Sequence, residues 1–550
     1  MRKIFFVLTV GILFSACQGE ISGLTENYEN NGLSQDVEDN VEVSLLQSDF
    51  IKYDMTDKSD RIYQVVLEKS HNVKQGVVEL VSYLPDLYKD DYTLLPEEFY
   101  SIDNQSLSFS EKETRKSLNL KLSNLSSIDV TKKYILGIKL QSSDFLINEK
   151  KDSVVFTLSL PEGLIGNPYI IKTPAHLLQI QDNLQENATT YFKFNNDIDM
   201  SGIEWTPIET TKTKKIAIDG QGYSIKNLKC QTSSSAYQGF FGLLIGECKN
   251  LNFIDANILA NQKMTGIVAG QVGLIDAKGV VENVNVSGNV DVKSGTAEAY
   301  LTAQAGGITG KLTGNESRIT YCSSTGKVKA DWSAGGLIGE IANSAVLSQS
   351  YSQAEVEALQ VAGGLCGNMY KGKINNCYSL GTVKALGYNI DIVPRIEGRA
   401  GGIAGRMDLD NTIENCYSTS QVSVYRHAGG IVGKIDNPGN SIKKTIAWND
   451  KLTASNTVNV VASGRISGHL NEVTNLKGEN CYAKKDMQIL INNVSRFDSF
   501  TLHATVDDKR FYDGESTDNI ITTAQTTLSW DTEIWDFSSE LPKLKWHSDN

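Results

Sequence analysis

Aromatic, guanidinium and imidazole side chains recur directly before a repeated Gly-Gly phrase in the second half of the chain. The segments that carry them read KADWSAGG, KALGYNIDIVPRIEGRAGG and SVYRHAGG. Aromatic side chains offer flat contact areas, and guanidinium groups form paired hydrogen bonds with carboxylates. We therefore predict a ligand-binding rim for sugar rings or acidic glycans, made of Trp332, Tyr388, Arg395, Arg399, Tyr425, Arg426 and His427. Solvated loop residues of the same types are the alternative interpretation, and the shared repeat position favours the rim.

Paired carboxylates are the other residues that could do chemistry, because polysaccharide lyases and hydrolases need an acid and a base close together. Asp197 and Asp199 lie two apart, as do Asp408 and Asp410 beside Arg406. Both pairs fall where polar turns are expected, so we predict no catalytic residue. The six histidines and the cysteines show no metal-ligand spacing, and no glycine phrase leads into a helix that could bind phosphate. We therefore expect no metal and no cofactor.

The Gly-Gly phrase belongs to an internal repeat. Five copies, AGGITG, AGGLIG, AGGLCG, AGGIAG and AGGIVG, begin at Ala305, Ala334, Ala362, Ala400 and Ala428, in steps of 29, 28, 38 and 28 residues. A unit this short cannot bury its own apolar face, whereas stacked units bury a continuous core. We predict a parallel β-helix, expected to be right-handed, whose strands pair in register with their copies one coil away. A β-propeller is the alternative, but its blades need about 40 residues each.

Two further repeat positions carry structural expectations. The Gly-Gly pair is expected either where the backbone needs a positive φ or where it lies close to a neighbouring coil. The asparagines of the second repeat phrase, Asn283, Asn376 and Asn415, are expected to form a ladder of amides that bond one another along the stack.

Four cysteines share one repeat position, which Val284 and Ser350 also occupy. They are Cys322, Cys377, Cys416 and Cys481. A position that accepts valine, serine and cysteine is typical of a small core site, so we predict buried free thiols. A disulfide between adjacent coils is the alternative.

The first residues read MRKIFFVLTVGILFSAC, a positive start, a short apolar stretch and small residues before Cys17. This pattern is typical of a secretion signal. It resembles the lipobox of bacterial lipoproteins, which implies that Cys17 carries lipid, and the following QGE resembles the export signal of Bacteroidota surface lipoproteins. The resemblance implies a partner, outer-membrane lipid through Cys17, and an outer-membrane location facing outward.

Composition and pattern divide the remainder of the chain. With 52 Lys and Arg against 65 Asp and Glu, the net charge of −13 excludes the basic stripe that nucleic-acid binding needs. We predict a signal peptide over 1–16, a flexible tether over 17–40, an immunoglobulin-like β-sandwich over 41–161, a β-helix with an opening helix over 162–480, and a C-terminal coil with an aromatic cap over 481–550. The fold class is therefore mostly β.

The repeat phrases and the strand order before them resemble known Bacteroidota proteins. The phrases resemble GLUG-repeat surface proteins, and the strand pattern of 41–161 resembles an N-terminal immunoglobulin-like domain of unknown function on surface lipoproteins. These resemblances imply a lipid-anchored adhesin or glycan-binding protein without catalytic activity, whose partner is a glycan or a host-surface protein. A β-helix polysaccharide lyase or hydrolase and a structural stalk subunit are the alternatives.

Overall fold

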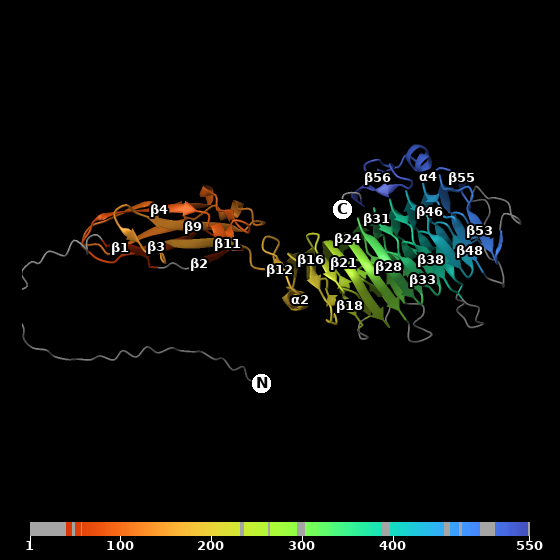
Figure 1. Ribbon diagram of the computed structural model, residues 1–550, viewed down its shortest axis with the longest axis horizontal. Coiled ribbons are helices and arrows are strands. Elements are labelled where there is room, and N and C mark those ends of the chain that lie inside the picture. The colour runs from red at the N-terminus through yellow and green to blue at the C-terminus, as the bar shows by residue number, and fades with distance from the viewer. Residues whose placement is uncertain are drawn as a thin grey trace, which may run out of the picture. The chain divides into compact units, whose positions relative to one another are not determined.

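A computed structural model describes residues 40–46, 50–56, 58–231, 236–261, 264–293, 303–387, 397–455, 463–471, 476–495 and 512–547. Cys17, Tyr388 and Arg395 lie outside these residues. The chain forms two compact units. The first comprises the described residues up to Asp129 together with Lys133–Leu158, and the second comprises Val130–Lys132 and the chain from Ser159 onward. Both units consist mostly of strands, as predicted (Figure 1).

The first unit contains two sheets whose strands are mainly antiparallel. One sheet has the order β10 (Leu146–Ile147), β1 (Glu42–Leu45), β3 (Arg61–Lys69), β8 (Arg115–Leu122) and β6 (Tyr100–Ile102). The other has the order β2 (Phe50–Asp54), β11 (Ser153–Ser159), β9 (Tyr134–Gln141), β4 (Gly76–Tyr83) and β7 (Ser106–Phe109), with β5 (Thr93–Leu94) paired to β9. Buried residues alternate with exposed ones along β8, and Tyr63 of β3 contacts Phe156 of β11 across the two sheets. The predicted sandwich is confirmed.

A short helix lies near the start of the second unit, where the sequence predicts one. Helix α2 (Pro174–Leu178) has Thr173 as its N-cap, and the Thr173 hydroxyl accepts a hydrogen bond from the backbone N–H of His176. Helix α3 (Ile180–Asn183) follows directly. Leu177 and Ile180 are buried, whereas Leu178 is half exposed.

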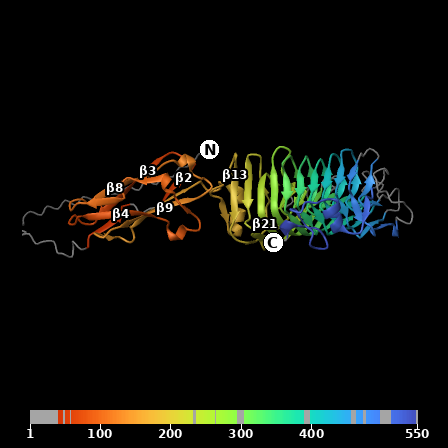
Figure 2. The same cartoon turned by 90° about the horizontal axis from the view of Figure 1, so that it is seen from above.

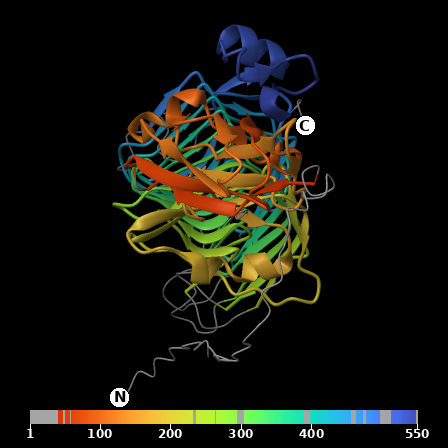
Figure 3. The same ribbon diagram turned by 90° about the vertical axis from the view of Figure 1, so that its left-hand side faces the viewer.

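The second unit is a parallel β-solenoid. Strands β12 (Tyr169–Ile171), β13 (Ala188–Phe194), β14 (Ile198–Asp199), β16 (Lys214–Asp219), β17 (Ser224–Lys226) and β18 (Lys229–Cys230) begin its largest sheet. Two long strands, β21 (Gly246–Ala260) and β24 (Gly279–Val292), follow in that sheet. Each later coil adds short strands to this sheet at three successive positions, which we call the first, second and third places. Figure 2 and Figure 3 show the coils stacked one behind another.

In the largest sheet, the strands of the later coils fall into three sets according to their position along the coil. The first place holds β27 (Arg318–Thr320), β31 (Val346–Ser348), β36 (Lys373–Asn375), β41 (Thr412–Glu414), β46 (Ser441–Lys443) and β51 (Lys477–Glu479). The second holds β32 (Tyr351–Ser352), β37 (Tyr378–Ser379), β42 (Tyr417–Ser418), β47 (Ile446–Ala447) and β52 (Tyr482–Lys484). The third holds β33 (Glu355–Ala358), β38 (Thr382–Ala385), β43 (Gln421–Val424), β48 (Lys451–Ala454) and β53 (Gln488–Ile491), while β28 (Ser323–Ala330) spans the second and third places.

Two further parallel sheets complete each coil. One holds β19 (Tyr237–Gln238), β22 (Met264–Gly266), β25 (Gln304–Gly306), β29 (Ser333–Gly335), β34 (Val361–Gly363), β39 (Arg399–Gly401), β44 (His427–Gly429) and β49 (Ser463–Gly464). The other holds β15 (Ile208–Glu209), β20 (Phe241–Leu244), β23 (Ala269–Val272), β26 (Thr309–Thr313), β30 (Ile338–Ala342), β35 (Cys366–Tyr370), β40 (Ala404–Met407), β45 (Val432–Ile435) and β50 (Ser467–Leu470).

The register of these sheets follows the repeat. The first alanine of every Gly-Gly phrase pairs with the first alanine of the next, from Ala305 through Ala334, Ala362 and Ala400 to Ala428. Their side chains are fully buried in one continuous apolar core that runs along the solenoid. The predicted in-register stacking is therefore confirmed.

The Gly-Gly pair serves the close approach of neighbouring coils. Each second glycine lies against the carbonyl oxygen of its counterpart one coil away, so that a Cβ at Gly336 or Gly364 would fall within 3.0 Å of that oxygen. Neither glycine has a positive φ. Of the two expected reasons for the glycines, the structure therefore selects close backbone approach.

The asparagine column has a different role from the one predicted. Asn283, Asn376 and Asn415 have φ values of 53°, 50° and 51° at the corner after the first strand of each coil. Asparagine is one of the few residues that adopts this left-handed conformation readily. The predicted amide ladder is confirmed only where Asn283 donates to Asn250, at 2.9 Å.

A second amide ladder, which was not predicted from the sequence, lies at another corner. Asn411 and Asn440 are buried, and the Asn411 side-chain amide donates to Oδ1 of Asn440 at 2.9 Å. The Asn411 oxygen in turn accepts from the backbone N–H of Gly372. These amides satisfy the backbone of the turns that join successive sheets.

The cysteines lie in the core, as predicted. The seven cysteines of the described chain are buried free thiols. Burial raises the pKa of the Cys322 thiol to about 12, so that it is protonated at neutral pH. Cys322 occupies the same column as Val284 and Ser350, which confirms the interpretation of a small core site.

The C-terminal aromatic residues, which were predicted to form a cap, pack against the side of the solenoid. After β54 (Val494–Ser495) and β55 (Glu515–Thr517), the chain forms α4 (Ile520–Thr522), a π-helical turn (Thr523–Thr527), β56 (Trp535–Asp536) and β57 (Lys543–Leu544). This segment, residues 520–547, lies along one side of the coils (Figure 1, Figure 3). We call it the C-terminal strap.

The C-terminal strap covers a stack of tyrosines. Tyr351, Tyr378 and Tyr417 stack at 4.8 and 5.0 Å between ring centroids. Trp535 packs on this stack, and its indole N–H donates to Oδ1 of Asn376 at 3.3 Å. The strap therefore joins several coils laterally.

The glycine interpretation predicts a specific loss of stability. Changing Gly364→Ala places a methyl group against the Gly402 carbonyl and the Ser379 hydroxyl, and we expect it to lower the free energy of unfolding by about 3 kcal/mol. Gly222→Ala is the control, because it has a positive φ but no atom within 4 Å of the added methyl, and should cost about 1 kcal/mol. Urea unfolding measures both. Equal losses would contradict the close-approach explanation.

The left-handed backbone conformation of the corner asparagines predicts different effects for two substitutions of Asn415. Asn415→Gly should leave the unfolding midpoint almost unchanged, whereas Asn415→Ala should cost about 1 kcal/mol, because only the backbone conformation is at stake. Asn375→Ala, one residue before an equivalent corner and without a positive φ, serves as the control in the same thermal unfolding assay. A greater loss for Asn415→Gly than for Asn415→Ala would show that the side-chain amide matters more than φ.

Candidate ligand-binding corner

Side chains of two neighbouring sheets meet at a corner of the solenoid, which we call the polar corner. In the sheet of β26, β30, β35, β40, β45 and β50, the residue after the last glycine of each phrase is polar and flanked by buried residues. These residues are Lys311, Glu340, Asn368, Arg406, Lys434 and His469. From the adjacent sheet, the Gln304 amide donates to Glu340 at 2.8 Å, so side chains of the two sheets face each other.

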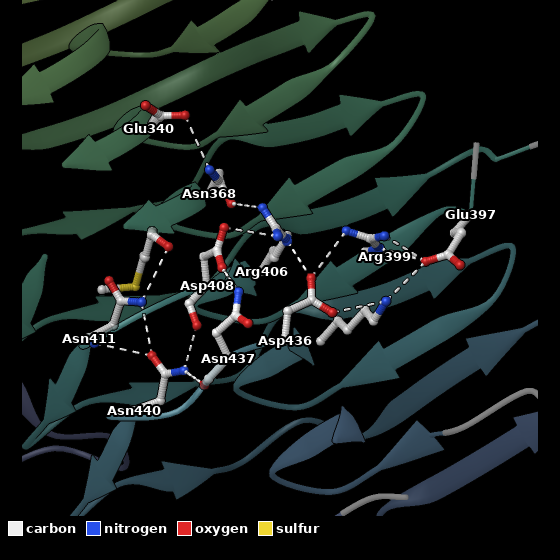
Figure 4. Close-up of polar contacts among 12 residues, drawn as sticks. Glu340, Asn368, Glu397, Arg399, Arg406, Asp408, Asn411, Asp436, Asn437 and Asn440 are labelled. Atoms are coloured by element: carbon white, nitrogen blue, oxygen red, sulfur yellow. Dashed lines mark hydrogen bonds and ion pairs between the residues drawn. The ribbon is translucent and has the colours of Figure 1, made fainter. Parts of the chain in front are cut away.

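A chain of polar contacts runs along this corner across several coils. Glu340 pairs with Lys311 at 2.8 Å and accepts from the Asn368 amide at 3.1 Å. Arg406 donates to Asn368 at 3.4 Å and forms an ion pair with Asp408 at 2.9 Å. Figure 4 shows that the same guanidinium reaches Asp436 in the next coil, so the contacts are continuous.

Two carboxylates bring together the basic side chains at the C-terminal end of the corner. Glu397 contacts Arg399 at 2.6 Å, Arg426 at 2.7 Å and Lys434 at 3.3 Å. Asp436 contacts Arg406 at 2.5 Å, Lys434 at 2.9 Å and Arg399 at 3.7 Å. Without these carboxylates, the cations stacked in neighbouring coils would repel one another.

The charges of the corner are fixed by this arrangement. Burial raises the pKa of Glu397, but the charges of Arg399, Lys434 and Arg426 outweigh it and hold the pKa at about 2. The pKa of Asp436 is also lowered, because Arg399, Lys434 and Arg406 outweigh its burial. Both carboxylates are therefore ionised at neutral pH, and neither has the raised pKa that a general acid needs.

Two histidines stack at the end of the polar corner. The rings of His427 and His469 lie 4.6 Å apart and almost parallel. Burial lowers the pKa of His427 well below its usual value, with His469 as the next cause. Burial, followed by the charge of Lys434, lowers the pKa of His469 to about 4. Both rings are therefore neutral at neutral pH, which allows them to stack.

The structure brings together three of the residues predicted for the rim. Arg399 and Arg426 both bind Glu397, and His427 follows Arg426 at a position with only 2% of its surface exposed. Trp332 is half buried against the core, and in the strand register it lies three coils from Arg426. Tyr425 packs beside Gly387 and Gly398.

Several residues of the corner were missed. Glu397 and Asp436 supply the counter-charges, and the column from Lys311 to His469 supplies one wall. The signal was present in the phrases ITGKL, LIGEI, LCGNM, IAGRM, IVGKI and ISGHL, each of which has a polar residue after its last glycine. The carboxylates that were considered as catalytic pairs have other roles: Asp199 ends β14, and Asp408 pairs with Arg406 at the polar corner. Asp199 accepts from the backbone and hydroxyl of Ser201, and Asp410 has a positive φ.

Two family models match parts of the chain. A family model described as the GLUG motif matches residues 302–329, across the first strong Gly-Gly phrase. The chain contains a GLUG motif. A second family model, described as "-like, N-terminal domain", matches residues 33–145.

Similarity to individual proteins is distant. An immunoglobulin A1 protease of Streptococcus pneumoniae is 22% identical over 63% of this chain and 17% of its own length. The chain thus spans less than a fifth of the curated relatives it matches. A Bacteroides ovatus crystal structure, provisionally described as an immunoglobulin A1 protease, is 24% identical with a TM-score of 0.37, over 70% of this chain and 94% of that one. Another from Bacteroides ovatus, provisionally described as a carbohydrate-binding protein, is 17% identical with a TM-score of 0.20, over 22% of this chain and 37% of that one.

Two kinds of functional feature are absent from the described residues. No cluster of three or more His, Cys, Asp or Glu side chains there is placed to hold a metal ion. No helix among those residues is long and apolar enough to cross a membrane.

The histidine stack predicts acid sensitivity. Because the folded pKa of His469 is about 4 and the unfolded value about 6.5, the unfolded chain binds more protons between these values, and stability falls as pH falls through this window. We expect a loss of up to about 3 kcal/mol from pH 7 to pH 4. Thermal unfolding of the protein and of His469→Gln, which cannot titrate, measures the difference. The same pH dependence of stability in the protein and in His469→Gln would refute the prediction that His469 causes the acid sensitivity.

Proposed function

We propose that this protein is a surface protein, anchored by lipid on Cys17 to the outward face of an outer membrane, which binds an acidic glycan at the polar corner of its solenoid without cleaving it. The observation that carries the proposal is the set of planar and charged side chains that hold one another in place at the corner (Figure 4). Side chains ordered before binding lose little conformational entropy when a ligand arrives.

The balance of charge supports an acidic ligand. The corner carries five basic side chains, Lys311, Arg399, Arg406, Arg426 and Lys434, against four carboxylates, Glu340, Glu397, Asp408 and Asp436. This small positive excess stands on a chain whose net charge is −13. An acidic sugar with hydroxyl groups matches both the guanidinium groups and the ionised carboxylates of the corner.

A binding role fits the corner better than hydrolysis or proteolysis. Glycoside hydrolysis needs one carboxyl group with a raised pKa, whereas Glu397 and Asp436 have lowered pKa values. The similarity to immunoglobulin A1 proteases covers a small share of those proteins. We propose that the shared part is the repeat region and that it serves attachment, with a host glycan or glycoprotein as the partner.

Arginine geometry at the corner provides the test. Arg406→Lys keeps the charge but loses the planar group that joins Asn368, Asp408 and Asp436, so we expect about tenfold weaker binding of uronate-containing or sialylated oligosaccharides. The control is Lys327→Ala, which removes an exposed lysine paired with Glu355 elsewhere on the solenoid. The measurement is a glycan array followed by calorimetry on the full-length protein. Binding unaffected by Arg406→Lys, or absence of binding to any acidic glycan, would overturn the proposal.

A further inference from the structure

A row of uncharged asparagine side chains lies on strands β21 and β24 of the solenoid, beside the coils that the C-terminal strap covers. At the corner column, Asn283 donates to Oδ1 of Asn250 at 2.9 Å, and Asn250 donates to Asp219 at 3.0 Å. Two residues further along each strand, a second row runs parallel to the first. There Asn285 donates to Asn252 at 3.1 Å.

The second row also continues in both directions along the stack. The Asn252 amide donates to the carbonyl oxygen of Gly222 at 3.0 Å, and the Ser323 hydroxyl donates to Oδ1 of Asn285 at 2.6 Å. We call Asn250, Asn252, Asn283 and Asn285 the amide platform. All four side chains are only half buried.

The amide platform retains hydrogen-bonding capacity toward solvent. Each asparagine amide has two N–H donors and an oxygen with two lone pairs. Within the rows, Asn283 and Asn285 each use one N–H toward the preceding coil. The second N–H of each amide, together with the remaining lone pairs, is held in a fixed orientation by the ladder.

An aromatic wall stands at the end of this platform. The Trp546 ring contacts Tyr321 at 6.2 Å and Tyr351 at 5.8 Å between centroids, and its indole N–H donates to the Gln349 carbonyl at 2.8 Å. Tyr321 occupies the same column as Asn283, and Ser323 the same column as Asn285. Trp546 and Tyr321 both remain half exposed.

The C-terminal strap covers the later members of the column that contains Asn285 and Ser323. In the coils of Tyr351, Tyr378 and Tyr417, the same column is occupied by stacked rings and covered by the aromatic residues of the strap. The strap reaches Trp546 at this edge, and the columns continue beyond it as amides. The amide platform is therefore continuous with a surface that already packs against flat rings.

We propose that the amide platform and the Trp546 wall together form a binding site for a neutral oligosaccharide, separate from the polar corner. Aromatic rings pack against the apolar faces of sugars, and fixed amides both donate to and accept from their hydroxyl groups. The amides themselves carry no charge. Asn250 contacts the carboxylate of Asp219, while Glu282 and Glu247 are paired with Arg318 and with Lys249. The site therefore selects for hydroxyl groups rather than for carboxylates.

The site is tested with calorimetry on the full-length protein, using neutral oligosaccharides of glucose, mannose, galactose and xylose and a uronate-containing oligosaccharide as the charged comparison. Trp546→Ala should weaken binding of the best neutral oligosaccharide about tenfold, and Trp546→Phe should retain most of it. Asn285→Ala should weaken it as well. Asn289→Ala changes an exposed asparagine of the same strand and should leave binding unchanged.

The outcomes separate this site from the polar corner. Loss of neutral binding in Trp546→Ala and Asn285→Ala, but not in Arg406→Lys, supports the platform. Neutral binding that survives both platform variants, or that is lost in Arg406→Lys alone, overturns the platform and leaves the corner proposal standing. If no neutral oligosaccharide binds while acidic ones do, the platform is wrong. If Trp546→Ala fails to fold, Asn285→Ala decides the result.

Discussion

In-register parallel pairing is the constraint on which the structure of the second unit depends. Each residue of a coil sits directly over its counterpart at about 4.8 Å, so every position of the repeat becomes a column of similar side chains. Glycine is required where Gly364 approaches the Gly402 carbonyl, and asparagine suits the left-handed corner at Asn415. The columns of the core, the corners and the outer faces all follow from this single spacing.

The same spacing places side chains of like charge next to each other, and the carboxylates of the polar corner offset their repulsion. Arg406 and Lys434 stack in neighbouring coils, so carboxylates from outside the column must separate them. Asp436 fills that role, and the neutral His469 ends the column without adding a charge. The need to balance stacked cations thus produces a surface of ordered polar groups, which is the property on which the proposed glycan binding depends.

The sequence predicted the repeat architecture well, but it did not predict the side-chain partners of the polar corner, for physical reasons. The period of the Gly-Gly phrases fixes the stacking, and the cysteine column follows from it because core positions tolerate only small or apolar side chains. Side-chain partners are different. Glu397 comes from a connection between strands, and the strap that places Trp546 on Tyr351 folds back from a distant part of the chain. Such contacts depend on three-dimensional proximity that no local pattern encodes.

Hydrogen–deuterium exchange on the full-length protein, with and without a saturating acidic oligosaccharide, tests the central claim most directly. The account predicts slower exchange at residues 397–408 and 427–436, which carry the contacts of Glu397, Arg406 and Asp436, while the N-terminal sandwich stays unchanged. Protection confined to the sandwich, or to the strands that lie away from the polar corner, would contradict it.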